Sequence, residues 1–320
     1  MGGSTKQALL QALSAAEGAY ISGQQLAEAL GVSRAAVHKA AQALLAQGYA
    51  LDSAPRRGYR LAGGDPFCAE AVGLYPAPIH IYDTLQSSNL TAKQLALGGA
   101  PHGTLVLTAH QKAGRGRLGR RFESPAGKGV YLSLILRPAL SAADAQSVTI
   151  SAAVAVARAV KALCGLELGI KWVNDLYYQG RKVCGILTEA GTDMECGQLE
   201  WLVVGIGLNL TTSSADWPEE LARTAGSLYP GGPAPVSRAV LAGAIARELL
   251  SLCPAFDCLD EYRARCFVPG HWVTVCTGAD TYAAKALSID DAGRLVVERE
   301  GGRQVALQHG EVSIRPTSTT

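Results

Sequence analysis

Short apolar strands alternate with alanine-rich helices between about Phe67 and Val268, and this alternation constrains the fold more than any other feature. The segments TLVLTAH, VYLSLILR and WLVVGIGLNL have the apolar, β-branched character of strands, whereas SAADAQSVTISAAVAVARAVKALCG has the pattern of a helix. Such an alternation predicts an α/β or α+β sheet domain. The chain has 320 residues, 48% of them hydrophobic, which is enough for two or three domains.

The first 61 residues predict three helices, of which the last two are joined by a tight turn. A helical pattern covers about residues 5 to 17, and a second begins at SGQQLAEALG, where Ser22 and Gln25 are placed as a capping box and Gly31 as a stop. Ser33 is placed as the N-cap of the next helix. The apolar stripe of that helix consists of Val37, Ala40, Ala41, Leu44 and Leu45.

The segment that follows, YALDSAPRRGYRL, reads as strand, turn and strand with two arginines at the tip. Helices in this order, followed by a basic hairpin, predict a winged helix-turn-helix whose second helix enters the major groove of DNA. The candidate DNA-binding residues are Ser33, Arg34, His38, Lys39, Arg56 and Arg57. We expect Arg34 and His38 at base edges and the two wing arginines at the backbone. The alternative is a helical bundle for protein contacts, with a solvated tip.

The segment AGGDP, residues 62–66, has the composition of a linker. The predicted domains are therefore a DNA-binding domain at 1–65, a catalytic domain at 66–268 and a C-terminal domain at 269–320. The C-terminal domain contains the strand-like runs HWVTVCT, TYAAKALSI, RLVVE and GEVSIR. The fold class predicted is a multidomain α+β protein.

Net charge, apolar segments and cysteine spacing limit the binding partners and metal sites that the chain is expected to have. A net charge of +2 means that any nucleic-acid binding must be local. The N-terminus lacks the pattern of a signal peptide, and no stretch has about 18 uninterrupted apolar residues, so we expect a cytoplasmic protein without a membrane partner. Eight cysteines include no C-x-x-C pair and no histidine at zinc-ligand spacing, so we expect thiols and no metal site of the protein's own.

The glycine-rich segment GRGRLGRRF, residues 114–122, has the spacing of a dinucleotide loop, but such a loop requires a helix directly after the third glycine. The residues after Gly119 instead contain breakers and then a strand. The segment is therefore predicted to be a flexible loop that presents four arginines to an anion, the alternative being a solvated charged loop. These arginines are Arg115, Arg117, Arg120 and Arg121.

The segment KWVNDLYYQGRKVCGILTE, residues 171–189, predicts a β-hairpin that turns near Gln179 and Gly180. Its register places Lys182 opposite Tyr177, and alternation along the strand places Lys171 and Asp175 on the same face. Two ammonium groups and a carboxylate then converge, although exposed hairpins also show such pairs by chance.

Two further segments complete the pattern. SSN at 87–89 lies between a strand and a helix, where an N-cap cluster is the alternative interpretation, and GIGLN at 205–209 interrupts a strand with glycines that permit close approach. The order SSN, QKAGRGRLGRRF, KWVNDLYYQGRKVCGIL, GIGLN is similar to biotin protein ligases. With the winged helix-turn-helix in front, the chain resembles the bifunctional biotin ligase and biotin operon repressor family over nearly its whole length, and its tail resembles that family's SH3-like barrel.

The resemblance implies an ATP-dependent biotin–[acetyl-CoA-carboxylase] ligase that forms biotinyl-5'-AMP and transfers biotin to a lysine of a biotin carboxyl carrier domain. It implies Lys182, Arg117 and Asp175 as catalytic residues, with Mg²⁺ carried by ATP beside Asp175. The implied biotin-binding residues are Ser87, Ser88, Asn89, Gln111, Gly114, Arg115, Arg117, Lys182, Gly185, Gly205 and Gly207. The implied ATP-binding residues are Arg117, Arg120, Arg121, Lys171, Asn174, Asn209 and Arg315.

The resemblance also implies that biotin acts as co-repressor and that ligand promotes an operator-binding homodimer. Leu118 and Phe122 replace an arginine and a tryptophan of the family's loop, differences that bear on loop closure and dimerisation. Trp217, in DWPEELA, is a poor positional match for an adenine-stacking residue and is left out of the predicted site. Two alternatives stay open: a biotin-sensing transcription factor without ligation, and a ligase of the lipoate or octanoate type.

Overall fold

The computed structural model describes residues 5–141, 145–192, 198–253, 255–278, 280–308 and 310–314. The chain forms two compact units, Met1–Leu74 with Val236–Val240, and Tyr75–Pro235 with Leu241–Thr320. Arg315 lies outside the described residues, so its predicted role stays a prediction.

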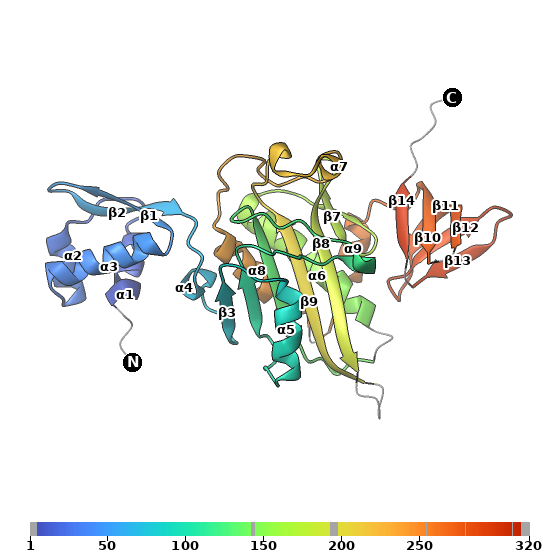
Figure 1. Ribbon diagram of the computed structural model, residues 1–320, viewed down its shortest axis with the longest axis horizontal. Helices are drawn as coiled ribbons and strands as arrows, with labels where there is room; N and C mark the ends of the chain where they lie inside the picture. The colour runs from blue at the N-terminus through green and yellow to red at the C-terminus, as the bar shows by residue number, and fades with distance from the viewer. Residues whose placement is uncertain are drawn as a thin grey trace. The chain divides into compact units, whose positions relative to one another are not determined.

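The first unit is a winged helix-turn-helix (Figure 1). Its elements are α1 (Thr5–Ala15), α2 (Gly23–Leu30), α3 (Arg34–Ala46), β1 (Tyr49–Ala54), β2 (Gly58–Gly64) and α4 (Ala69–Val72). The predicted caps are confirmed: Ser22 and Gln25 form a capping box, Gly31 is left-handed with φ 63°, and Ser33 Oγ accepts from the backbone of Ala36. The predicted stripe is buried except for Leu45, which is exposed.

The segment expected to be a linker is structured at both ends. Residues 62–64 complete β2, and Asp65 pairs with Arg238, accepting from its backbone N–H at 2.8 Å. The Arg238 guanidinium also lies 4.5 Å from the ring centre of Phe67. Asp65 and Phe67 are thus fixed by Arg238, the first residue of α8 (Arg238–Leu252), although their segment has the composition of a linker.

The second unit is built on a seven-stranded mixed sheet with the order β3-β4-β5-β9-β8-β7-β6. Only β3 and β4 are parallel neighbours among these strands. The strands are β3 (Ile79–Tyr82), β4 (Leu105–Thr108), β5 (Gly129–Leu136), β6 (Gly169–Lys171), β7 (Asp175–Tyr178), β8 (Arg181–Thr192) and β9 (Leu199–Asn209). Every residue of β5 is buried, as expected for a central strand covered on both faces.

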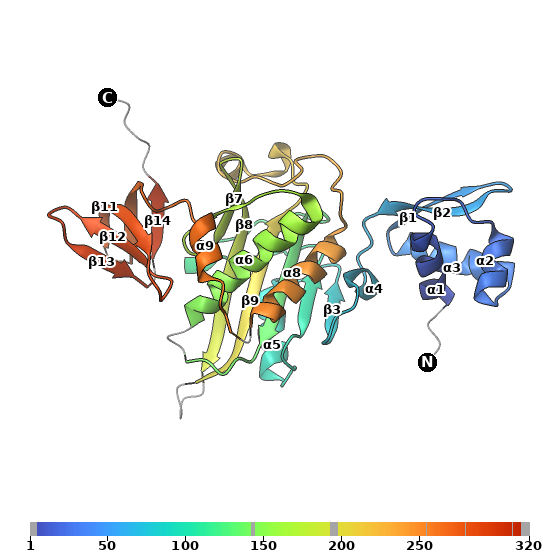
Figure 2. The same ribbon diagram turned by 180° about the vertical axis from the view of Figure 1, so that it is seen from behind.

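Helices cover both faces of this sheet. On one face lies α5 (Ser88–Leu97), whose Ala92 and Ala96 pack in a core with Val106, Ile135 and Val203. The other face carries α6 (Ala145–Cys164) and α8 (Arg238–Leu252) (Figure 2). The shorter helices are α7 (Glu219–Ala222), α9 (Leu259–Arg265), η1 (Arg117–Gly119) and η3 (Ser214–Asp216). By length and composition α6 alone among the described helices is apolar enough to cross a membrane, but most of it is buried, as in the core helix of a globular fold.

The C-terminal part of this unit is a five-stranded antiparallel sheet with the order β13-β12-β11-β10-β14. Its strands are β10 (Trp272–Thr277), β11 (Asp280–Ile289), β12 (Leu295–Arg299), β13 (Gln304–Leu307) and β14 (Glu311–Ile314). Four of these strands were predicted, and β13 was missed because QVAL is too short to give a periodic signal.

The hairpin around Lys182 has the predicted pairing of Tyr177 with Lys182. The strand expected to run continuously from Lys171 is broken, however: the chain reverses at residues 172–174, and Lys171 of β6 pairs with Asp175 of β7. Lys171 and Asp175 still meet, because directly opposed residues of an antiparallel pair share a face.

Candidate functional site

One cavity of about 330 Å³ brings together the segments that the sequence analysis singled out. It lies over the β7, β8 and β9 strands, with the start of α5 at one end and the loop of residues 112–124, here called the arginine loop, above it. Of the predicted catalytic, biotin and ATP residues that the structure describes, only Gly114 does not line it.

Gly114 instead packs at the base of the arginine loop. A side chain there would overlap the carbonyl of Phe122, and the Phe122 N–H donates to the carbonyl of Gly114 at 2.9 Å. Its glycine is required by the path of the loop.

The end of the cavity nearest α5 is a buried network of hydroxyl and amide groups. Gln111 Oε1 accepts from the Ser88 backbone N–H at 2.9 Å and from Ser88 Oγ at 3.2 Å, and Gln111 Nε2 donates to Ser124 Oγ at 2.8 Å. Ser133, which sequence reasoning missed, donates to Asn89 Oδ1 at 2.6 Å. Ser87 occupies the N-cap position of α5, where its carbonyl accepts from the Thr91 N–H at 3.2 Å, but its side chain makes no capping hydrogen bond.

Two glycines of β9 form the floor of the cavity. A β-carbon at Gly205 would overlap Asn89 Oδ1, and one at Gly207 would lie 2.5 Å from the Phe122 ring. The predicted close approach at these glycines is thus made by side chains, and Phe122 supplies an apolar wall beside the polar network.

The opposite end of the cavity is positively charged. Lys182 Nζ lies 2.6 Å from Asp175 Oδ1, an ion pair whose angles fall outside hydrogen-bond geometry, so this buried oxygen keeps accepting capacity. Arg117 Nη1 donates to Asn174 Oδ1 at 3.1 Å, and Asn174 in turn donates to the Ile186 carbonyl at 2.8 Å. This end is lined by Lys171, Lys182, Arg117 and Asp175 and by the Arg120–Glu311 ion pair, which acts electrostatically on Lys171, so cations outnumber carboxylates among these described residues.

Each arginine of the loop has a different partner. Arg115 lies 3.9 Å from Glu189, Arg120 pairs with Glu311 of β14 at 2.6 Å, and Arg121 pairs with Glu123 at 2.9 Å. Arg117 is the one of the four without a carboxylate partner among the described residues, and it donates to the side-chain amide of Asn174 instead.

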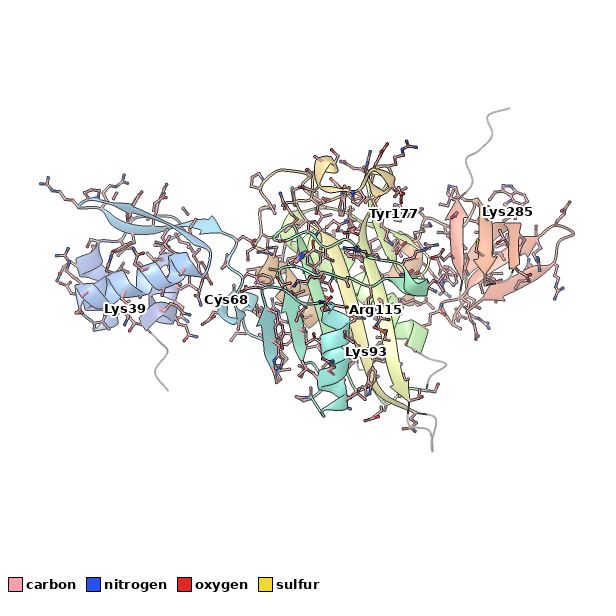
Figure 3. All side chains as sticks on the ribbon, in the orientation of Figure 1. Lys39, Cys68, Lys93, Arg115, Tyr177 and Lys285 are labelled. Carbon is pink, nitrogen blue, oxygen red and sulfur yellow. The ribbon has the colours of Figure 1, made fainter. Side chains whose placement is uncertain are left out.

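Burial shifts the pKa values of two groups at this end of the cavity. Desolvation lowers the pKa of Lys171, and the Asp175 carboxylate opposes that shift in part. Burial also raises the pKa of Tyr177 to about 12, so its hydroxyl stays protonated at neutral pH. Tyr177 is labelled in Figure 3 on this side of the sheet.

The wall beyond the charged end was not predicted. Trp217, set aside in the sequence analysis, lines the cavity with Leu221 and Thr224, and it is largely buried. Asn209 donates to the Gly226 carbonyl at 3.0 Å, while its Oδ1 is buried without a hydrogen-bond partner. No sequence signal marked this wall, because it is formed by a loop around η3 and α7 that has no motif of its own.

The predicted DNA-binding residues lie on the first unit. Arg34, His38 and Lys39 are exposed on α3, and Arg56 and Arg57 are exposed at the hairpin tip. His38 Nδ1 lies 3.1 Å from Tyr59 Oη, which links α3 to β2. The Arg57 guanidinium packs 4.2 Å from the ring centre of Tyr20, so it is less available to DNA than Arg56.

Comparison with known proteins agrees with this architecture. Three family models match: an HTH domain at residues 5–60, the biotin/lipoate A/B protein ligase family at 82–209, and the biotin protein ligase C-terminal domain at 270–315. The chain is 34% identical over 313 residues to the bifunctional ligase/repressor BirA of Bacillus spizizenii, covering 92% of this chain and 94% of that one. It is 32% identical to a biotin–[acetyl-CoA-carboxylase] ligase of Mycobacterium tuberculosis, over 71% of this chain and 85% of the relative.

A solved structure shares the fold. A biotin protein ligase from Aquifex aeolicus, in complex with biotin and ATP, has a TM-score of 0.61 and 24% identity, covering 74% of this chain and 98% of that one. From the identity, the coverage and the three matching domains it follows that the chain belongs to the biotin/lipoate A/B protein ligase family, among its bifunctional ligase/repressors.

Proposed function

We propose that this protein joins biotin to AMP at the expense of ATP, transfers biotin to a lysine of a carrier domain, and represses transcription when biotin is plentiful. The observation that carries this proposal is a single cavity with two chemically different ends, a neutral hydrogen-bonding end and a cationic end. We retain the division into domains at 1–65, 66–268 and 269–320 as part of this proposal.

The cationic end suits the first chemical step. A carboxylate oxygen of biotin attacks the α-phosphorus of ATP, the bond to the β-phosphate bridging oxygen breaks, and pyrophosphate leaves. The two reacting groups are anions, so fixed cations must cancel their repulsion. We assign this task to Lys182 and Arg117, with Asp175 holding the Lys182 ammonium in place.

The neutral end suits the ureido ring of biotin. A buried urea needs acceptors for its N–H groups and donors for its carbonyl oxygen. Asn89 Oδ1 supplies an acceptor, because both hydrogens of its amide are already directed at Glu189 and Leu187. The hydroxyl of Ser87 supplies a donor, and Phe122 covers the apolar part of the ring system.

The wall at Trp217 suits the nucleoside. The unpartnered Oδ1 of Asn209 needs a donor, and a phosphate oxygen has none to offer, so we assign Asn209, an implied ATP-binding residue, to the adenine amino group or a ribose hydroxyl. Trp217 is placed to pack on the adenine ring.

Magnesium fits this site only in the company of ATP. No group of three histidine, cysteine, aspartate or glutamate side chains in the described part of the chain is arranged to hold a metal ion. Asp175 would help to hold the ion together with the ATP phosphates, and the ion would shield phosphate charge.

In the second half-reaction, a lysine amine of a biotin carboxyl carrier domain attacks the carbonyl carbon of the adenylate, and AMP leaves. In the repressor role, the residues proposed to contact operator DNA are Arg34, His38, Lys39 and Arg56. Ordering of the arginine loop by ligand would favour a DNA-binding homodimer, while carrier docking would favour the monomer. A cytoplasmic location stays a prediction.

Pyrophosphate release from ATP tests the enzymatic proposal. The purified protein is supplied with biotin, lipoate or octanoate, and Lys182→Ala is compared with Lys285→Ala, a control lysine on β11 (Figure 3). We expect release with biotin only, lost by at least about a hundredfold in Lys182→Ala and unchanged in the control. Tight biotin binding without release would make the protein a sensor, and release with octanoate or lipoate would make it a ligase of the other type.

A further inference from the structure

Asn89 is fixed by partners on three sides. Its Nδ2 donates to Glu189 Oε2 at 3.0 Å and to the Leu187 carbonyl at 3.2 Å, and its Oδ1 accepts from Ser133 at 2.6 Å. Glu189 is a residue of β8 that lies 100 positions from Asn89 in sequence, at the end of the segment 171–189, and it is not among the predicted site residues.

The other carboxylate oxygen of Glu189 faces two cations. Lys93 Nζ of α5 donates to Oε1 at 3.0 Å, and Arg115 Nη1 of the arginine loop lies 3.9 Å from the same atom. Lys93 and Arg115 are labelled close together in Figure 3. Burial raises the pKa of Glu189, but the hydrogen bonds from Asn89 and Lys93 outweigh it and hold the pKa below its ordinary value, so Glu189 is ionised at neutral pH.

We propose that Glu189 is a positioning residue for biotin selectivity: it turns the Asn89 oxygen toward the ureido ring and connects that orientation to Arg115 of the arginine loop. This inference rests on the proposed function. An ionised carboxylate can only accept, so it must face the NH₂ side of the amide, and the oxygen is left over Gly205, on the floor of the cavity.

The arrangement gives Arg115 a task different from the one expected from sequence. Its partner lies at the ureido end of the cavity, whereas Arg117 reaches the cationic end. Arg115 is half-exposed, so its contact with Glu189 depends on the conformation of the arginine loop. The contact of Lys93 with Glu189 depends instead on the position of α5. Recognition of the ureido group is thereby coupled to loop position.

A polarity exchange tests this inference. Biotin KM and kcat for adenylate formation are measured for wild type, Glu189→Gln, Glu189→Ala, Asn89→Asp and the double variant Asn89→Asp with Glu189→Gln. We expect Glu189→Ala and Asn89→Asp to raise biotin KM by about tenfold or more with ATP KM unchanged, since one loses the orienting group and the other opposes two carboxylates. The double variant should recover most of the loss, because the introduced glutamine amide can donate to the introduced aspartate.

A second comparison tests the link to the loop. Arg115→Met should raise biotin KM by about threefold or more in the wild-type background and have a smaller effect when Glu189→Gln is already present. Lys285→Ala serves as the control, and thermal unfolding of each variant shows whether it is folded.

The outcomes separate this inference from the proposed function. If wild type releases no pyrophosphate with biotin, the proposed function fails. If wild type is active but Glu189→Ala leaves biotin KM unchanged, or the double variant is no better than the worse single variant, then Glu189 does not position Asn89. Additive effects of Arg115→Met and Glu189→Gln would overturn the coupling to the loop.

Discussion

Lys171 on β6 and Lys182 on β8 belong to the two strands that flank β7, yet their environments differ. Lys182 forms an ion pair with Asp175 at 2.6 Å, whereas Lys171 is partly buried and has no ion pair within the described residues. Burial disfavours the charged form of Lys171 and therefore lowers its pKa, and the nearby Asp175 offsets this shift only in part. The anions of ATP would supply the missing partner.

This difference predicts a change in pH dependence for Lys171→Arg. The lowered pKa means that Lys171 loses its charge as pH rises, below the ordinary value of 10.5, so adenylation should decline there. Arginine keeps its charge, so the alkaline limb of kcat/KM should move to higher pH even if the overall rate falls. Initial rates between pH 7 and about 10.5 measure this shift. An unmoved limb would show that another group titrates.

The same shift affects stability in a defined direction. Between the lowered native pKa and 10.5 the unfolded chain binds the extra proton, so the free energy of unfolding contributed by this group rises with pH in that window. Lys171→Arg should remove this rise, which denaturant titrations at several pH values would detect.

At the scale of elements, the turn between β11 and β12 meets the segment KWVND. Trp172 Nε1 donates to the Gly293 carbonyl at 3.0 Å, and Gln146 Nε2 of α6 donates to the same oxygen at 2.7 Å. Gly293 is also left-handed, with φ 75°, and a side chain there would overlap Ile150. The turn therefore fixes the position of the segment between Lys171 and Asp175 through a hydrogen bond to Trp172.

Trp172→Phe should weaken this contact while filling most of the same space. One of two donors to the carbonyl remains, so we expect a loss of about 1 kcal/mol in the free energy of unfolding and a rise in ATP KM with biotin KM unchanged. Urea unfolding and steady-state kinetics measure the two effects. Equal rises in both KM values would indicate general loosening of the sheet instead.

At the scale of the whole molecule, the two proposed activities belong to different units. The caps of α2 and α3 are local to residues 22–36, and the residues that line the cavity come from Ser87 onward. Operator binding and biotin activation should therefore be separable by truncation.

Removal of residues 1–65 should abolish operator binding and leave biotin-dependent pyrophosphate release. The cut also removes Asp65, so Arg238, already largely buried, loses its carboxylate partner and some stability with it. A mobility shift assay with operator DNA and the pyrophosphate assay report the two activities. Loss of pyrophosphate release from a folded truncated protein would show that the units are energetically coupled.

Ligand-promoted assembly also belongs to this scale. Biotin with ATP should shift the intact protein toward a dimer in analytical ultracentrifugation, because ordering of the arginine loop favours one conformation. Leu118 is exposed on this loop, at a position where the family that the chain resembles has an arginine, so it bears directly on this coupling. A protein that stays monomeric with both ligands bound would contradict this part of the proposal.

The sequence by itself determined the features that depend on near neighbours. Caps at Ser22, Gly31 and Ser33 act within one turn, and the pairing of Tyr177 with Lys182 follows from a two-residue turn, so local chemistry decides both. The four motif segments were also predicted to share a site, on the strength of their resemblance to a known family, and residues of all four line one cavity.

Tertiary structure alone decided which further residues support or complete that cavity. Ser133 and Glu189 hold Asn89, which lines it, while Trp217 and Glu311 line it themselves. These contacts follow from the strand order and the loops above it. The reversal at residues 172–174 could likewise not be predicted from the alternation of residues along a strand. Lys171 and Asp175 lie on the same face of the sheet whether the strand runs on between them or reverses and pairs them. Contacts between residues about a hundred positions apart have no local signature, so their energy appears only once the sheet is assembled.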